Sequence, residues 1–373
     1  MAIKLPDPLK QARREAATIK SNPYQFLRAG FERVMADAPY VNPEELLSGI
    51  EAFHKERMGK IPSDHTYPEA KPWVEYVLAV DRHLQELAGM SDREMAIYRG
   101  LGQYLAFRGY INTDPKMPEK CRVAFIPETD RGPIHIKNVD DPIKFWKPDP
   151  KPVKELPRFD RLVCDGVGNG LHIDDEPEEI FPLPVHAMCM AHCNEVPSAV
   201  EFFTRYSQFW GGGNLVLHDA QMRSVAIEKA SHNFIEAFPP DRCGGSHVSG
   251  MVCRDPKSPQ GRYQAQKRNE FLRRFNQPDD GTEMAHWGVC AREEEMLAAL
   301  MSKLRVRVDE LFTLFTTPWP DGMNTNGEML HPKQGYAGYT LMTFAWLPGE
   351  KKVYRWQRGT DAVFPKEPEV YTF

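Results

Sequence analysis

The segment from Cys121 to Asp140 constrains the fold of this chain more than any other, because it has the pattern of a tight β-hairpin. Val123–Pro127 is a short β-prone run, and Glu128–Gly132 contains the Asp and Gly that are typical of a turn. Ile134–Val139 has apolar residues at alternate positions, as a half-buried strand requires. Since a hairpin folds its second strand back along the first, we expect Asp140 to lie near the backbone nitrogen of Cys121.

This placement has a chemical consequence if the peptide bond before Cys121 is cleaved, because the new α-amine then lies beside the thiol of the same residue. An α-amine has a pKa of roughly 7.7–8.0 and a thiol a pKa of about 8.5, so the two groups can exchange a proton near neutral pH. Asp140 would orient the amine through a charge-assisted hydrogen bond. The structural alternatives are a buried strand cysteine at position 121 and an ordinary turn aspartate in Asp140-Asp141-Pro142.

Cys121 and Lys137–Asp140 together resemble the N-terminal-nucleophile (Ntn) hydrolases of the acyl-CoA:6-aminopenicillanate acyltransferase and choloylglycine hydrolase kind. The mature chain of that family begins with Cys, and its second strand ends in Arg-Asn-x-Asp. Gly213–Glu228 resembles the family's paired strands Asn-x-x-x-x-Asp-(turn)-x-x-x-Glu, and Gly245–Met251 stands where the family usually has Thr-Asn-His-Phe. The resemblance extends from about Trp73 to the C-terminus. Each motif is short, and it is their order and spacing together that indicate the family.

The order of elements predicts an α+β protein, with helices in the first 115 residues and mixed antiparallel strands and helices after them. The resemblance implies a finer description, a four-layer αββα sandwich in which Cys121 begins a central strand. Residues 1–120 would then be a helical leader or propeptide, and residues 121–373 the Ntn-type catalytic domain.

The resemblance also implies catalytic roles. Cys121 would be the nucleophile, freed by autocleavage at Lys120–Cys121, and Asp140 would hold its α-amine. Ser246 takes the place of the family's oxyanion-stabilising Asn, and a hydroxyl can also donate one hydrogen bond there. Asn169 is a second candidate donor, because the glycines around it would let the backbone approach a substrate closely; an ordinary Gly-Asn turn is the alternative.

Three further residues are candidates for substrate binding. Lys137 stands where the family has Arg, and it lacks the bidentate fork of a guanidinium. His247 matches the family's His, and Arg262 loosely matches the Arg of a Ser-x-x-Arg-Tyr motif. A solvated strand charge and a strand histidine with a satisfied hydrogen bond are the alternatives for the first two.

These residues predict an Ntn-type cysteine acyltransferase or amidohydrolase that acts on a small-molecule amide or acyl-thioester through an acyl-thioester at Cys121, with no cofactor. One alternative is an uncleaved single-chain thiol hydrolase, in which His247 serves as the base. A second is a non-catalytic binding protein on an Ntn scaffold. A third is a metal-sensing protein that uses His186, Cys189 and Cys193, which share a helical face; because no fourth ligand is evident at a recognised spacing, we expect no metal.

Composition limits the remaining possibilities. The chain has 373 residues, and its net charge of −5 from 47 basic and 52 acidic residues argues against a dominant nucleic-acid surface. No stretch of 18 uncharged apolar residues is present, so no membrane span is expected. Seven cysteines without a visible signal peptide indicate reduced thiols and a cytoplasmic location. Oligomeric state leaves no mark on the sequence.

Capping and turn signals predict particular elements. Asn42-Pro43-Glu44-Glu45 predicts a helix start, with the helix ending at Gly59, and Ser91–Glu94 is a capping box. Leu215–Lys229 and Gly338–Trp356 predict hairpins.

Overall fold

The computed structural model describes residues 5–21, 42–107, 121–142, 160–167, 181–209, 213–231, 234–238, 246–249, 257, 262, 293, 295–330, 337–359 and 363–372. Contacts divide the chain into two compact units. The first, here the helical unit, comprises Met1–Thr113, His172–His192 and Phe202–Gly211. The second, here the sheet unit, comprises Asp114–Leu171, Cys193–Glu201 and Gly212–Phe373. Of the predicted leader at residues 1–120, Met1–Thr113 therefore shares a unit with two later segments.

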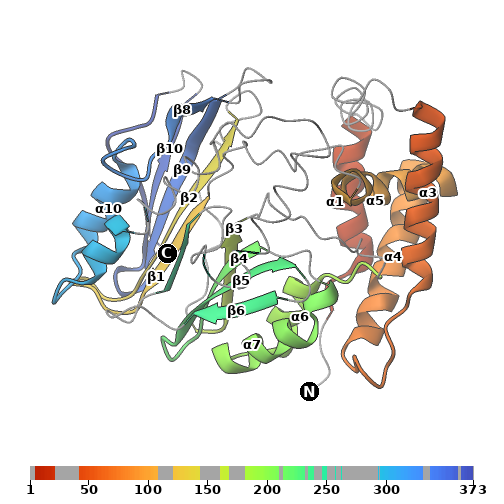
Figure 1. Ribbon diagram of the computed structural model, residues 1–373, viewed down its shortest axis with the longest axis horizontal. Helices are drawn as coiled ribbons and strands as arrows, with labels where there is room; N and C mark the ends of the chain where they lie inside the picture. The colour runs from red at the N-terminus through yellow and green to blue at the C-terminus, as the bar shows by residue number, and fades with distance from the viewer. Residues whose placement is uncertain are drawn as a thin grey trace. The chain divides into compact units, whose positions relative to one another are not determined.

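Where the structure describes the helical unit, its regular elements are helices. They are α1 (Pro8–Ser21), α3 (Pro43–Gly59), α4 (Ala70–Ala88), α5 (Asp92–Phe107) and α6 (Val185–His192), with the short 3-10 helix η2 (Ser207–Phe209) (Figure 1). Asn42 caps α3 by accepting a hydrogen bond from Glu44 N at 2.9 Å, and the helix ends at Gly59 as predicted. Ser91 and Glu94 form the predicted capping box, with Ser91 N bonded to Glu94 Oε2 at 2.8 Å.

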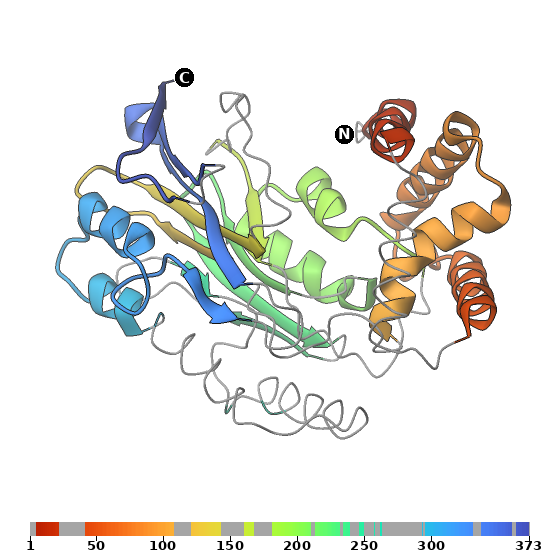
Figure 2. The ribbon, with the colours of Figure 1, turned by 90° about the horizontal axis from the view of Figure 1, so that it is seen from above.

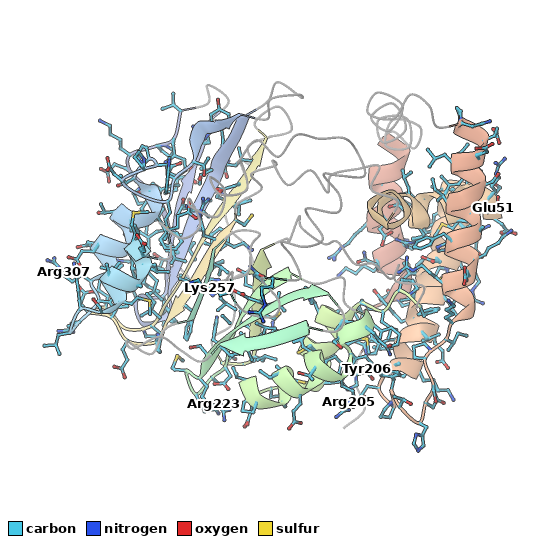
Figure 3. All side chains as sticks on the ribbon, viewed as in Figure 1. Glu51, Arg205, Tyr206, Arg223, Lys257 and Arg307 are labelled. Atoms are coloured by element: carbon cyan, nitrogen blue, oxygen red, sulfur yellow. The ribbon has the colours of Figure 1, made fainter. Side chains whose placement is uncertain are left out.

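Apolar and polar contacts both occur within the described part of the helical unit. Ala12 and Ala16 of α1 are buried against Val80 and Leu84 of α4, where small residues allow close helix packing. The division between the units runs through α7 (Val196–Arg205). At the end of that helix Arg205 and Tyr206, both labelled in Figure 3, bond the carboxylate of Glu69 at 3.0 and 2.8 Å.

The larger sheet of the sheet unit is antiparallel and has the strand order β11-β10-β9-β2-β1-β7, with β8 also paired to β9. Its strands are β1 (Arg122–Ile126), β2 (Ile134–Pro142), β7 (Ser246–Ser249), β8 (Asn326–Leu330), β9 (Ala337–Leu347), β10 (Lys352–Gln357) and β11 (Glu369–Thr372). Between β9 and β10 lies the 3-10 turn η3 (Pro348–Glu350). The hairpin of β1 and β2 is the one that the sequence predicts, and β1 lies between β2 and β7 inside the sheet.

The smaller sheet has the order β3-β4-β5-β6 and is also antiparallel. Its strands are β3 (Val163–Val167), β4 (Gly213–His218), β5 (Ser224–Ser231) and β6 (Phe234–Phe238). The predicted hairpin at Leu215–Lys229 is β4 and β5. Its turn is held by the buried Asp219, whose carboxylate accepts from Gln221 N, Arg223 N and, at the start of α7, Val196 N.

Alternate residues of β1 and β2 point to opposite faces of the larger sheet. The inner face, which carries Val123 and Phe125, packs on Val216 and Ala226 of the smaller sheet. The outer face packs against helix α10 (Val308–Thr316) in an extensive apolar cluster. Figure 1 shows α10 and the smaller sheet on opposite sides of the larger sheet, and Figure 2 shows the same arrangement from above. Two faces of one hairpin are thus buried in two different environments.

The α+β class and the antiparallel character of the strands are confirmed. Along the described residues, no helix is long and apolar enough to cross a membrane.

Candidate functional site

Cys121 immediately precedes β1 and contacts the apolar cluster of the inner face. Its Sγ lies 3.9 Å from the carbonyl oxygen of Asp140, to which it donates a weak hydrogen bond. Burial and the negative charge of Asp140 raise the pKa of the Cys121 thiol to about 11, against the opposing charges of Lys137 and Arg122. In the uncleaved chain the sulfur is therefore a protonated thiol at neutral pH.

A buried ion cluster, here the outer triad, occupies the outer face next to Cys121. Arg122 pairs through Nη1 with Asp140 Oδ2 and through Nη2 with Glu293 Oε1. The side chains of Arg122, Asp140 and Glu293 are 2%, 1% and 1% exposed. Thr325 Oγ1 also lies 3.4 Å from Arg122 Nη1. A guanidinium can serve two carboxylates at once because its donors form a planar fork.

Asp140 contacts groups on both faces, because its side chain alternates to the outer face with Asn138 while its backbone carbonyl lies beside Cys121. The carbonyl of Asp140 accepts from the Cys121 thiol while its carboxylate reaches Arg122. The hairpin thus places Asp140 beside Cys121, and it also supplies the carboxylate with a cation that the sequence analysis did not foresee.

The inner face carries a second buried polar cluster, here the inner network, which joins the two sheets. Lys137 Nζ of β2 donates to Asp165 Oδ1 of β3 at 2.5 Å, and His135 Nε2 lies 2.9 Å from Asp165 Oδ2. His135 Nδ1 lies 3.1 Å from His218 Nε2 of β4. The ring of His218 stacks on Phe125 with centroids 4.0 Å apart. The inner network therefore fixes one lysine, one carboxylate and two imidazoles in a continuous chain of contacts.

The protonation of this network follows from its electrostatics. Burial raises the pKa of Asp165, but the hydrogen bond and charge of His135, together with Lys137, outweigh burial and bring that pKa below its usual range. An ionised Asp165 accepts only, so His135 Nε2 carries a hydrogen and donates to it. Burial, reinforced by His135, places the pKa of His218 well below its ordinary value, so His218 is neutral at pH 7.

The structure does not bring Ser246 and His247 beside Cys121. In the ladder of β1 and β7, Ser246 pairs with Phe125 and His247 pairs with Ala124. Their backbones thus lie four and three residues farther along the strand than Cys121, roughly 10–13 Å at the rise of a β-strand. Asn169 and Lys120 lie outside the described residues. Arg262 Nη1 donates to the carbonyl of Lys257, a contact within its own segment.

The cysteine–histidine cluster on α6 has ordinary packing contacts. His186 contacts Phe203 edge-on, Cys189 is buried, and Cys193 Sγ donates to the carbonyl of Ser198 at 3.4 Å. In the part of the chain that the structure describes, no group of three His, Cys, Asp or Glu side chains is placed to hold a metal ion.

The sequence did not indicate five members of the two clusters, which are Arg122, His135, Asp165, His218 and Glu293. A signal existed for His135, because it alternates with Lys137 along β2 and so shares its face. For Asp165 and Glu293 no local pattern indicated a role, since each meets its partner only through tertiary contacts. The chain matches no known family profile, and no curated protein shows significant similarity to it.

Proposed function

We propose that this chain is an Ntn-type cysteine acyltransferase or amidohydrolase with Cys121 as its nucleophile. One observation carries the proposal: Cys121 stands at the start of an internal strand between two packed sheets, with Asp140 brought alongside by the return strand of the same hairpin. The proposed layering is αββα, with α10 outside the larger sheet and the first part of α7, held by Asp219, outside the smaller one.

The proposed reaction requires cleavage before Cys121, because a thiol with a pKa of about 11 is a poor nucleophile at pH 7. Cleavage would free an α-amine on the same residue. The amine takes the thiol proton, and the thiolate attacks the carbonyl carbon of an amide or thioester. The tetrahedral adduct then collapses, and the amine returns the proton to the leaving amine or thiol. Water, or an acceptor amine, finally attacks the acyl-thioester and regenerates the thiol.

An oxyanion donor is needed at the level of Cys121, and the sheet registers point to Asn214 for this role. The stacking of Phe125 on His218 aligns β1 with β4 at one level. Two residues along, Lys137 bonds Asp165, and these residues pair in their sheets with Val123 and Val216, so Val123 and Val216 lie at the next level. One further step of two residues, about 7 Å along each strand, leads from Val123 to Cys121 and from Val216 to Asn214. Asn214 is buried, and its amide can donate hydrogen bonds to a developing negative charge.

A non-catalytic protein on the same scaffold is the second candidate, and the outer triad favours it. Arg122 already supplies the positive charge that pairs with Asp140. In a processed chain, the α-ammonium of Cys121 would supply that charge. In such a protein Cys121 would remain an internal, protonated residue.

Mass spectrometry of the purified chain separates the two candidates. We expect the wild type to yield a fragment with Cys121 at its N-terminus and Cys121→Ala to stay at full length. p-Nitrophenyl octanoate, a generic acylating probe, should add one octanoyl group to Cys121 with release of p-nitrophenolate. A wild-type chain that stays whole and takes no acyl group at Cys121 would overturn the enzymatic proposal.

A further inference from the structure

The ion pair of Lys137 and Asp165 links the two sheets at the inner face, close to Cys121. Their side chains are 15% and 22% exposed, so the pair is largely removed from water. Lys137 pairs with Val123 in the hairpin ladder, two residues from Cys121. Diagonal neighbours of this kind on one face lie about 7–8 Å apart, which is within reach of a lysine side chain. The ammonium of Lys137 is therefore the cation that β2 brings to the face of the sulfur.

The surroundings of Asp165 restrict where that ammonium can go. Besides Lys137, the carboxylate bonds His135, whose ring is held in turn by His218 and by an edge contact with Trp346. Because both histidines are fully buried, the bond from His135 holds the Asp165 carboxylate in place. A largely buried ammonium that lost this carboxylate would bear an uncompensated desolvation cost, and its flexible stem would let it turn toward water.

We propose that Asp165 is a positioning residue for the Cys121 nucleophile: it fixes the Lys137 ammonium on the inner face, where its charge stabilises the Cys121 thiolate. This inference rests on the proposed function and extends it. The negative charge of Asp140 destabilises the Cys121 thiolate. Arg122 is paired with two carboxylates, so its positive charge stabilises the thiolate less than its charge alone would. Lys137 is one of the charges that lower the pKa of Cys121 against the larger effect of burial.

The test is the rate of iodoacetamide alkylation at Cys121, followed by peptide mass spectrometry at pH 8.5, where the rate scales with the thiolate fraction. We expect Lys137→Met to slow alkylation about tenfold, since loss of a nearby opposite charge shifts a pKa by about one unit or more. Asp165→Asn should slow it in the same direction, and the double variant no further than Lys137→Met alone, because Asp165 acts through Lys137. Asp165→Glu should restore part of the rate.

A matched control is Glu310→Gln, which removes the carboxylate of an exposed ion pair with Lys303 and should leave the rate unchanged. Circular dichroism verifies that each variant is folded. Faster alkylation in Asp165→Asn would show that the carboxylate only screens the charge of Lys137, which would overturn the proposal. An unchanged rate in that variant would also overturn it, as would additive losses in the double variant. Alkylation needs neither cleavage nor turnover, so its outcome is independent of the p-nitrophenyl octanoate assay that tests the function.

Discussion

The two faces of the β1–β2 hairpin use charge in opposite ways. On the outer face, one arginine serves two carboxylates next to Asn138, whose amide donates to the carbonyls of Phe315 and Met323 at 3.1 and 3.0 Å. On the inner face, a lysine, a carboxylate and two imidazoles form a chain that ends near a thiol. The outer groups tie the hairpin to neighbouring segments, whereas the inner groups are the kinds that move protons and stabilise anions.

This contrast follows from the alternation of a strand, which sends neighbouring residues to opposite sides. Cys121 and Arg122 are consecutive, yet the first contacts the apolar cluster shared with the smaller sheet and the second belongs to the outer triad. We infer that residues of the outer triad mainly determine stability, and that residues near Cys121 on the inner face mainly determine reactivity. The first and last of the three predictions that follow test that division, and the second tests the protonation state of the inner network.

The largest effect should come from Arg122→Met. This change leaves Asp140 and Glu293 buried together without their shared cation, and removing one partner of a buried ion pair costs about 3–5 kcal/mol. Urea unfolding followed by tryptophan fluorescence measures the loss. Lys303→Met, which breaks an exposed pair with Glu310, should cost less than about 1 kcal/mol. Equal losses in the two variants would mean that the outer triad does not hold the hairpin in place.

An intermediate effect should appear as a pH dependence caused by His218. Its pKa is held well below the ordinary value by burial, so between that value and about pH 6.5 only the unfolded chain binds the proton. The neutral form of His218 therefore contributes fully to the free energy of unfolding above about pH 6.5. As the pH falls below that value, the free energy of unfolding decreases by up to about 1.4 kcal/mol per pH unit.

Urea unfolding of wild type and His218→Gln at pH 7.5, 6.5 and 5.5 measures this slope. We expect the variant to lose stability less steeply than the wild type below pH 6.5, whatever its stability at pH 7.5. Cys121→Ala retains His218 and should keep the wild-type slope. Parallel curves for wild type and His218→Gln would show that His218 is not held neutral by the fold.

The smallest effect on stability should come from Cys121→Ala. The thiol makes one long contact with the carbonyl of Asp140 and lies at the edge of the inner apolar cluster, so its loss should cost about 1 kcal/mol or less. The same unfolding measurement gives this value. A loss as large as that of Arg122→Met would place Cys121 among the structural residues and break the proposed division between the faces.

Local signals predicted much of the secondary structure. The cap at Asn42, the capping box at Ser91 and the hairpin that begins after Cys121 all depend on residues a few positions apart, and such short-range patterns can be recognised directly. The same range explains why Asp140 was expected near Cys121, since a tight turn determines which residues of two adjacent strands meet.

The residues that make up the candidate site were harder to predict from the sequence. Ser246 was chosen by its place in a motif, but the register of β7 against β1 sets it beside Phe125 instead of Cys121. A register depends on where two distant strands align, and the sequence of the four-residue strand β7 does not by itself indicate which residues of β1 it meets.

The sequence by itself thus determined the hairpin, the capped helices and the pairing of one cysteine with one aspartate at its open end, because these depend on turn chemistry and on the period of a strand. Only the tertiary structure decided that Glu293 would share the guanidinium of Arg122 with Asp140, and that Asp165 and His218 would meet Lys137 and His135. Those contacts join residues from 28 to 171 positions apart. The contacts of Asp165 and His218 exist because two sheets pack face to face, and no local sequence pattern extends over such separations.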